Sequence, residues 1–122
     1  MTTCGCSTAT KLIFPCSGAA DVGEITDLAA RKLTKEKAGK MFCLAGIGGK
    51  VSGIVESTKS ASKILVIDGC SLGCAKKTMN KAGFDDFEYL ELSSIDLKKG
   101  HSPATNKNID KVVIKGKSLL TC

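Results

Sequence analysis

The sequence predicts an α/β fold in which helices cover both faces of a mostly parallel, four-stranded sheet, as in Rossmann-like and flavodoxin-like proteins. Short apolar runs alternate with segments that repeat apolar residues at helical spacing along most of the chain. The clearest run, residues 63–68, contains four consecutive aliphatic residues, which is typical of a strand buried on both faces of a parallel sheet. Strands that alternate with helices form βαβ units, so we expect a three-layer domain.

The first half of the chain predicts two strands and two helices. Residues 11–15 and 40–44 are the expected strands, and the glycine-rich residues 46–49 are the expected turn after the second. Asp21 with Glu24 resembles a capping box at the start of the first helix, and Gly39 closes that helix. The apolar residues at helical spacing are Val22, Ile25, Leu28, Ala29 and Leu33 in the first helix, and Val51, Ile54 and Val55 in the second.

The second half continues the alternation. After the strand at residues 63–68 we expect a helix that Gly83 ends, with Leu72, Ala75, Met79 and Ala82 facing inward. Residues 87–92 predict a fourth strand, and the polar residues 93–107 predict a loop. Ile109, Val112, Val113, Gly116, Leu119 and Leu120 favour a final helix, although the run Val112-Val113-Ile114 also suits a strand.

The length and composition fit one globular domain. The 122 residues are 43% hydrophobic and 25% charged, with a mean hydropathy of +0.08. We expect a single domain over residues 11–122, preceded by a mobile segment, residues 1–10, that contains Cys4-Gly5-Cys6. No apolar run approaches the roughly 20 residues of a membrane helix, and the N-terminus does not resemble a secretory signal. These features predict a cytoplasmic protein without a membrane partner.

The positive charge favours a solvated lysine surface over nucleic-acid binding. The net charge is +6, but the lysines are spread along the chain and Arg31 is the single arginine. Arginine supplies most base contacts and phosphate clamps, and only 4% of the residues are aromatic, which leaves few side chains for base stacking. We therefore do not expect a nucleic-acid partner.

The seven cysteines are the main functional signal. A cytoplasmic protein keeps its thiols reduced, and an odd number leaves one thiol unpaired, so a disulfide framework is not expected. Cysteines this frequent in a reduced compartment more often bind metal or react. Composition does not choose between these two roles.

Four cysteines fall where parallel strands end. Cys16 follows the first predicted strand, Cys43 lies near the end of the second, Cys70 follows the third, and Cys74 lies one helical turn beyond Cys70. Ligands of open parallel sheets bind beyond the carboxyl ends of the strands, so these thiols share one edge if the three strands are adjacent. Four thiolates suit zinc, or less commonly an iron–sulfur cluster.

Two other interpretations of these cysteines stay open. In the first, the protein is a thiol oxidoreductase or sulfur carrier that uses Cys16 or Cys70 as a low-pKa nucleophile. In the second, the cysteines are ordinary small residues of the hydrophobic core. This interpretation suits Cys43 best, because it lies beside Phe42 and Leu44. Asp68 either supports the site from behind the ligands or lies at a solvent-facing strand end.

Several enzyme motifs are incomplete. Gly46-Ile47-Gly48-Gly49-Lys50 resembles a phosphate-binding loop but has Leu44 and Val51 where glycine and a hydroxyl residue belong, although its backbone amides still offer a weak anion site. A cysteine phosphatase loop needs an arginine six residues after Cys16, and this position is Val22. No histidine is placed as a base for a cysteine, and His101 is expected to be a loop residue. The sequence therefore favours a non-enzymatic role.

The order of motifs resembles the DGC-domain family, whose members are described as candidate zinc-binding proteins. The shared motifs are Pro15-Cys16-Ser17-Gly18, Cys43-Leu44-Ala45-Gly46, Asp68-Gly69-Cys70 and Gly73-Cys74, and the similarity runs from about residue 11 onward, including residues 96–101. The resemblance implies that Cys16, Cys43, Cys70 and Cys74 are the metal ligands. Cys4, Cys6 and Cys122 fall outside the pattern. The resulting hypothesis is a protein that handles or senses zinc, with an unidentified protein partner.

Overall fold

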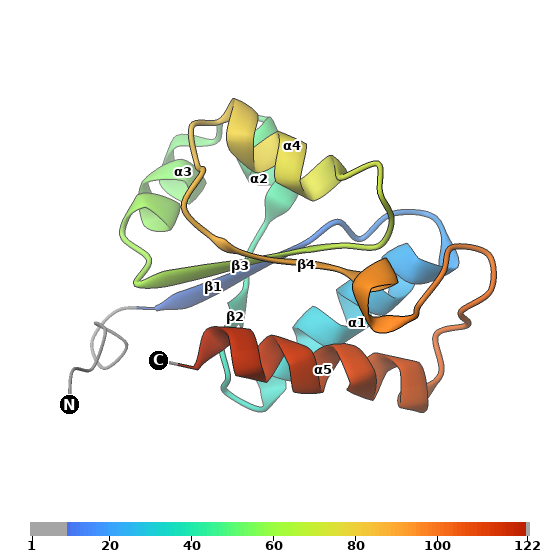
Figure 1. Ribbon diagram of the computed structural model, residues 1–122. Coiled ribbons are helices and arrows are strands. Elements are labelled where there is room, and N and C mark those ends of the chain that lie inside the picture. The colour runs from blue at the N-terminus through green and yellow to red at the C-terminus, as the bar shows by residue number, and fades with distance from the viewer. Residues whose placement is uncertain (1–9, 122) are drawn as a thin grey trace.

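The computed structural model describes residues 10–121, in which four strands alternate with helices (Figure 1). In chain order the elements are β1 (Lys11–Pro15), α1 (Asp21–Lys35), β2 (Lys40–Met41), α2 (Leu44–Gly48), α3 (Ser52–Lys59), β3 (Lys63–Asp68), α4 (Cys74–Lys81), β4 (Glu88–Glu91), the 3-10 turn η1 (Leu92–Ile95) and α5 (Asn106–Leu120). The predicted α/β class is confirmed, and the run Val112-Val113-Ile114 is helical.

The sheet is parallel throughout, with the order β2-β1-β3-β4. β1 lies between β2 and β3, so the three strands that precede the candidate cysteines are adjacent, as the sequence hypothesis requires. The order begins as in flavodoxin-like sheets, where the chain first builds outward on one side of β1 and then returns to the other side.

The helices form one layer on each face of the sheet. α1 and α5 cover one face, and α2, α3 and α4 cover the other (Figure 1). Crossovers between parallel strands are right-handed. After β2 the chain returns across β1 to form β3 on its other side, so the later connecting helices lie on the opposite face of the sheet. The loops after β1 and β3 consequently diverge at the carboxyl edge of the sheet.

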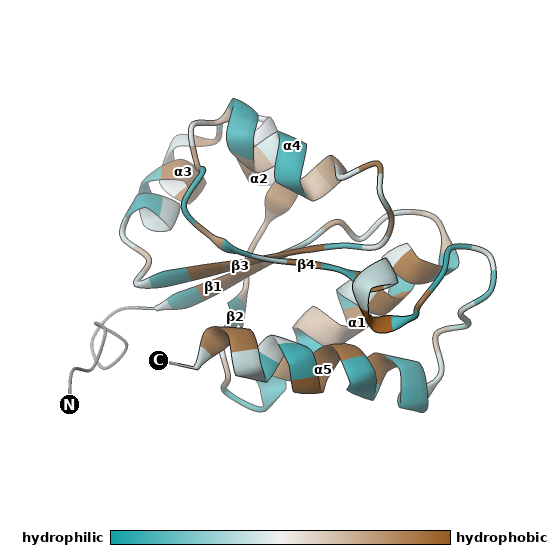
Figure 2. Cartoon of the chain, in the orientation of Figure 1, coloured by the Kyte–Doolittle hydropathy of each residue, from teal (hydrophilic) through white to brown (hydrophobic). Residues whose placement is uncertain are grey.

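The core consists of two apolar clusters separated by the sheet. Ile13, Leu65 and Ile67 pack toward α1 and α5, whereas Phe14 and Val66 pack toward α2 and α4. The strands β1 and β3 therefore bury both of their faces, which explains their continuous apolar runs. Figure 2 shows the same pattern, with hydrophobic residues concentrated on the strands and on the inward sides of the helices.

The boundaries of several elements differ from the prediction. β2 ends at Met41, and the expected glycine-rich turn is the short helix α2, which begins when the amides of Gly46 and Ile47 bond to the carbonyl of Cys43. Gly46 packs so closely on α3 that an added Cβ would lie 2.2 Å from Ile54 Cδ1. The expected polar loop at residues 93–107 contains most of η1 and the start of α5.

The helix ends also require corrections. Ala20, not Asp21, precedes the first turn of α1, and α1 ends at Lys35 with Lys37 in the left-handed region (φ 61°), so Gly39 does not close it. Gly83 (φ 91°) follows α4 as predicted. Leu72 does not face inward: it is 57% exposed, because α4 begins only at Cys74, after the left-handed turn at Gly73.

The expected segment at residues 1–10 lies, apart from Thr10, outside the described residues, as does Cys122. No helix within residues 10–121 has the length and apolar content required to cross a membrane.

Candidate thiol site

Three of the four predicted cysteines line one pocket at the point where the strand order reverses. This thiol pocket has a volume of 440 Å³ and lies between the loops that follow β1 and β3. Its chemically distinctive lining residues are Cys16, Cys70, Cys74, Asp68, Leu72 and Lys99, and much of the remaining wall consists of glycine and alanine from residues 18–23. Doubly wound sheets bind their ligands at this reversal, because the diverging loops leave a crevice.

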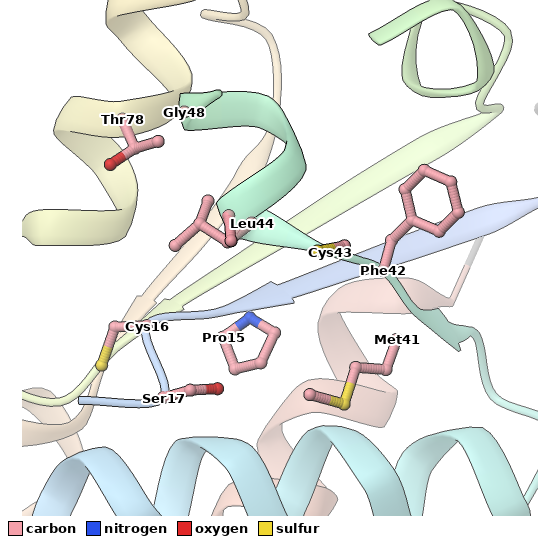
Figure 3. Close-up of a pocket in the computed structure, with 10 residues that line it drawn as sticks. Pro15, Cys16, Ser17, Met41, Phe42, Cys43, Leu44, Gly48 and Thr78 are labelled. Atoms are coloured by element: carbon pink, nitrogen blue, oxygen red, sulfur yellow. The ribbon is translucent and has the colours of Figure 1, made fainter. Parts of the chain in front are cut away.

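Cys43 lies in an adjoining pocket. That pocket also has a volume of 440 Å³ and is lined by Met41, Phe42, Cys43 and Thr78, among other residues (Figure 3). Cys16 lines both pockets, and in the view of Figure 3 its sulfur points away from Cys43. The separation follows from the strand register: Met41, the last residue of β2, pairs with Ile13, two residues before β1 ends.

The four thiols are not assembled into a metal cluster. Within residues 10–121, no three His, Cys, Asp or Glu side chains are close enough together to hold a metal ion. Cys16, Cys43, Cys70 and Cys74 are free thiols; Cys16 and Cys70 are partly buried, and Cys43 and Cys74 are exposed. The donor chemistry fits a thiophilic metal, but binding one requires the side chains to converge.

Thr26 holds the Cys16 turn against α1. Its hydroxyl donates to the carbonyl of Gly23 at 2.7 Å and accepts from the amide of Ser17 at 3.1 Å. Cys16 Sγ lies 3.5 Å from the same oxygen. Because a hydroxyl has one proton and this proton points at Gly23, the Cys16 thiol is the donor in the third contact. Thr26 was not predicted as part of the site.

Asp68 is a buried helix cap. It is 1% exposed, and its two carboxylate oxygens accept from the amide of Ala75 at 2.8 Å and the amide of Lys76 at 3.0 Å. These amides belong to the first turn of α4, where no helical carbonyl is available to them. The prediction of a solvent-facing strand end is therefore wrong. Asp68 instead fixes the helix start that carries Cys74.

Tyr89 completes the cap from β4. Its hydroxyl donates to Asp68 Oδ2 at 2.8 Å, and the side chain lies beside the turn at Gly73. Burial raises the pKa of Tyr89 well above its ordinary value, and the hydrogen bond to Asp68 raises it further. The sequence contained one signal for this residue, since Tyr89 is the only tyrosine and lies in the expected fourth strand, residues 87–92.

Two glycines allow the loops of the site to interlock with α1. An added Cβ at Gly69 would lie 2.9 Å from Val22 Cγ2, and one at Gly23 would lie 2.3 Å from the carbonyl oxygen of Gly18. The loop after β3 thus rests directly on the first turn of α1, and the loop after β1 folds over the same turn. This contact explains why glycine precedes Cys70.

Asp21 ties a distant segment to the same helix start. Its carboxylate accepts from the amides of Gly100 at 2.9 Å and Ser102 at 3.0 Å, as well as from the amide of Val22 at 2.8 Å. The bonds from Gly100 and Ser102 lower the pKa of Asp21 below its ordinary 3.8. The expected capping box with Glu24 is therefore wrong, because the carboxylate serves residues 100–102 instead. His101 is an exposed loop residue, as predicted.

The structure does not support the weak anion site that was expected at residues 46–50. The amides of Gly46 and Ile47 donate to the carbonyl of Cys43, the amide of Gly49 donates to Ala45, and that of Lys50 donates to Ile47. A phosphate-binding loop needs free amides that point at the ligand. These amides are occupied by the helical turn of α2 and its end.

Comparisons with known proteins agree on one family. A family model described as the DGC domain matches residues 12–115. The chain is 34% identical over 88 residues to the anaerobic and virulence modulator AnvM of Pseudomonas aeruginosa, and this match covers 72% of the chain and 67% of that protein. No solved structure matches the chain.

Proposed function

This chain belongs to the DGC domain family, and we propose that it is a non-enzymatic metal-binding protein that handles or senses zinc through the thiols of Cys16, Cys70 and Cys74. One observation carries the proposal: three thiols, two from the loops after β1 and β3 and one from the first residue of α4, line a single pocket at the reversal of the strand order. Thiolates are preferred zinc ligands, and this edge is where sheets of this topology bind ligands.

Cys43 has a different part in this proposal. Its pocket adjoins the thiol pocket and shares Cys16 with it. Three thiolates leave a tetrahedral ion with one open position. Cys43, which is exposed, is suited to take that position during entry or release of the metal, so that the site alternates between three and four protein ligands.

A bound zinc would draw the two loops together and supply a fixed charge at the sheet edge. The residues of the chain would do the rest: Asp68 holds the helix start behind Cys74, and Thr26 holds the turn at Cys16. Cys16 has to lose its proton to bind metal, so its hydrogen bond to Thr26 would be given up or reversed.

The similarity to AnvM supports a regulatory use of the site. That protein is named as a modulator, and we infer that metal occupancy in this chain likewise alters a contact with a protein partner. We place the protein in the cytoplasm, because a reducing compartment keeps free thiols available for metal.

The decisive experiment is elemental analysis of protein purified without oxygen. About one zinc per chain is expected for the wild type and for the control Cys122→Ser. Cys16→Ser, Cys70→Ser and Cys74→Ser should each lose most of the metal. Cys43→Ser should keep it but release it to a chelator at a different rate. Metal-free wild-type protein, or equal retention by all four variants, would reject the proposal.

A thiol oxidoreductase or sulfur carrier is the second candidate, because Cys16 and Cys70 face the same pocket, as a nucleophile and its resolving thiol must. The two functions differ in thiol reactivity. A metal site protects its thiols from alkylation until a chelator is added. A redox site leaves one thiol unusually reactive in the reduced protein, whether or not a chelator is present.

A further inference from the structure

Lys99 gives the thiol pocket a cation. Among the residues that line the pocket, Lys99 is the only basic one. Its ammonium group forms no ion pair within the described part of the chain, whereas Lys32, Lys59 and Lys117 all do. An unpaired cation in the lining of a pocket attracts anions and stabilises negative charge inside it.

The other charged group of the pocket, Asp68, is less accessible from solvent than Lys99. Both oxygens of Asp68 already accept hydrogen bonds, from Ala75, Lys76 and Tyr89. The carboxylate is also buried behind the loop, whereas Lys99 is exposed. A molecule that enters from solvent can therefore reach the lysine side chain, whereas the carboxylate is covered.

The backbone around Lys99 is held at both ends. Leu97 is 2% exposed and packs into the core on the α1 and α5 side, and Ser102 is 4% exposed. Between them, the amide of Lys98 donates to Ser102 Oγ at 2.7 Å, and the Asp21 carboxylate accepts from Gly100 and Ser102. Figure 1 shows this segment, ahead of α5, beside the start of α1.

We propose that Lys99 makes the thiol pocket selective for small anionic ligands, such as thiolates or carboxylates, and that Asp21 is the residue that positions it. The inference deepens the proposed function, because it names the class of molecule that exchanges metal with these thiols. Neutral molecules of the same size gain no electrostatic attraction from the lysine. Asp21 positions Lys99 through its bonds to the backbone amides of Gly100 and Ser102.

The test compares two alkylating probes of similar size, the anion iodoacetate and the neutral iodoacetamide. Their rates are measured at Cys16, Cys70 and Cys74 by peptide mass spectrometry on the full metal-free chain at low ionic strength. The readout is the ratio of the iodoacetate rate to the iodoacetamide rate, which cancels changes in thiol reactivity common to both probes. Cys122, in the same samples, gives a reference ratio.

Lys99→Gln should lower the ratio about threefold at the pocket thiols, the scale of one exposed charge in water. Lys99→Arg should keep the wild-type ratio. Lys98→Gln is the matched control, because Lys98 is adjacent and exposed but does not line the pocket. Asp21→Asn should lower the ratio as Lys99→Gln does, although it leaves every lysine in place and removes a negative charge, which by itself would raise the ratio. Added salt should bring the wild type toward Lys99→Gln.

Equal ratios in Lys99→Gln and Lys98→Gln would overturn the role of Lys99. An unchanged ratio in a folded Asp21→Asn variant would overturn the positioning role of Asp21, and circular dichroism checks that the variant is folded. Because no metal enters this experiment, its failure is separate from a failure to bind zinc.

Discussion

At the scale of single residues, Asp68 connects three elements of the site. It ends β3, caps α4 and accepts the hydroxyl of Tyr89 from β4. All three partners are hydrogen-bond donors, so both side-chain oxygens of Asp68 must be acceptors. This requirement explains why an acidic residue, with no access to solvent, precedes Gly69 and Cys70.

Replacement of Asp68 by asparagine is predicted to destabilise the fold by about 2–4 kcal/mol, because the amide nitrogen would face a donor and leave it unsatisfied. Tyr89→Phe, which removes a single bond, should lose only about 1 kcal/mol. Urea unfolding monitored by circular dichroism measures both free energies of unfolding. A loss in Asp68→Asn no larger than in Tyr89→Phe would contradict the capping role.

Asp21 is predicted to make the segment at residues 100–102 sensitive to acid. Its pKa is lowered in the folded protein, so the bonds to Gly100 and Ser102 are complete above pH 3.8 and are lost as the pH falls through the lowered value. The amide proton shifts of Gly100 and Ser102 in NMR spectra should titrate together, with a midpoint below 3.8. Asp21→Asn should abolish this titration. A midpoint above 3.8 would contradict the assignment.

At the scale of elements, the site depends on how tightly two loops pack on the start of α1. Gly23 lies inside that helix, where glycine is normally unfavourable, yet the carbonyl of Gly18 leaves no room for a side chain. Gly53 offers a contrast, since it lies in α3, and among residues 10–121 nothing beyond its chain neighbours and the backbone of its own helix lies within 4 Å of an added Cβ. Close packing therefore explains the glycine at position 23, whereas no such contact requires the glycine at position 53.

The same substitution is predicted to have opposite effects at these two positions. Gly53→Ala should stabilise the protein by about 0.5 kcal/mol through helix propensity. Gly23→Ala should destabilise it by about 2 kcal/mol, because the new Cβ meets a backbone oxygen. Denaturant midpoints compared with the wild type measure both. Stabilisation by Gly23→Ala would show that the loop at Gly18 is not packed as described.

At the scale of the whole molecule, the sheet order brings together loops that leave for opposite faces. Cys16 contacts the core cluster beneath α2 and α4, and Cys70 contacts the cluster beneath α1 and α5. A ligand held by both thiols therefore links the two layers of helices across the sheet. Binding energy at this edge should appear as stability of the entire domain.

Zinc is predicted to raise the melting temperature of the metal-free chain by roughly 10 °C at a free concentration of about 100 times Kd. Magnesium at the same concentration should have no effect, because it prefers oxygen ligands. Cys70→Ser should abolish the zinc shift, and Cys122→Ser should retain it. Differential scanning fluorimetry gives the comparison, and an equal shift in Cys70→Ser would argue against binding at the pocket.

The sequence by itself determined the α/β class, the number and order of the strands, and the position of Cys16, Cys43 and Cys70 beyond the ends of three of them. These features rest on local signals: apolar periodicity, glycine at turns, and the rule that parallel strands share a carboxyl edge. The start of α1 shows where local signals fail, because the Asp21 carboxylate suits both a local helix cap and a distant partner. Local patterns do not distinguish the two.

Tertiary structure alone decided what surrounds the thiols. The strand order set the reversal between β1 and β3, and the short β2 placed Cys43 in a pocket of its own. Asp21 meets Gly100 and Ser102 across 79 and 81 residues, and Tyr89 meets Asp68 across 21. Such contacts arise from packing of layers that are remote in the chain, so no periodicity or spacing in the sequence encodes them directly.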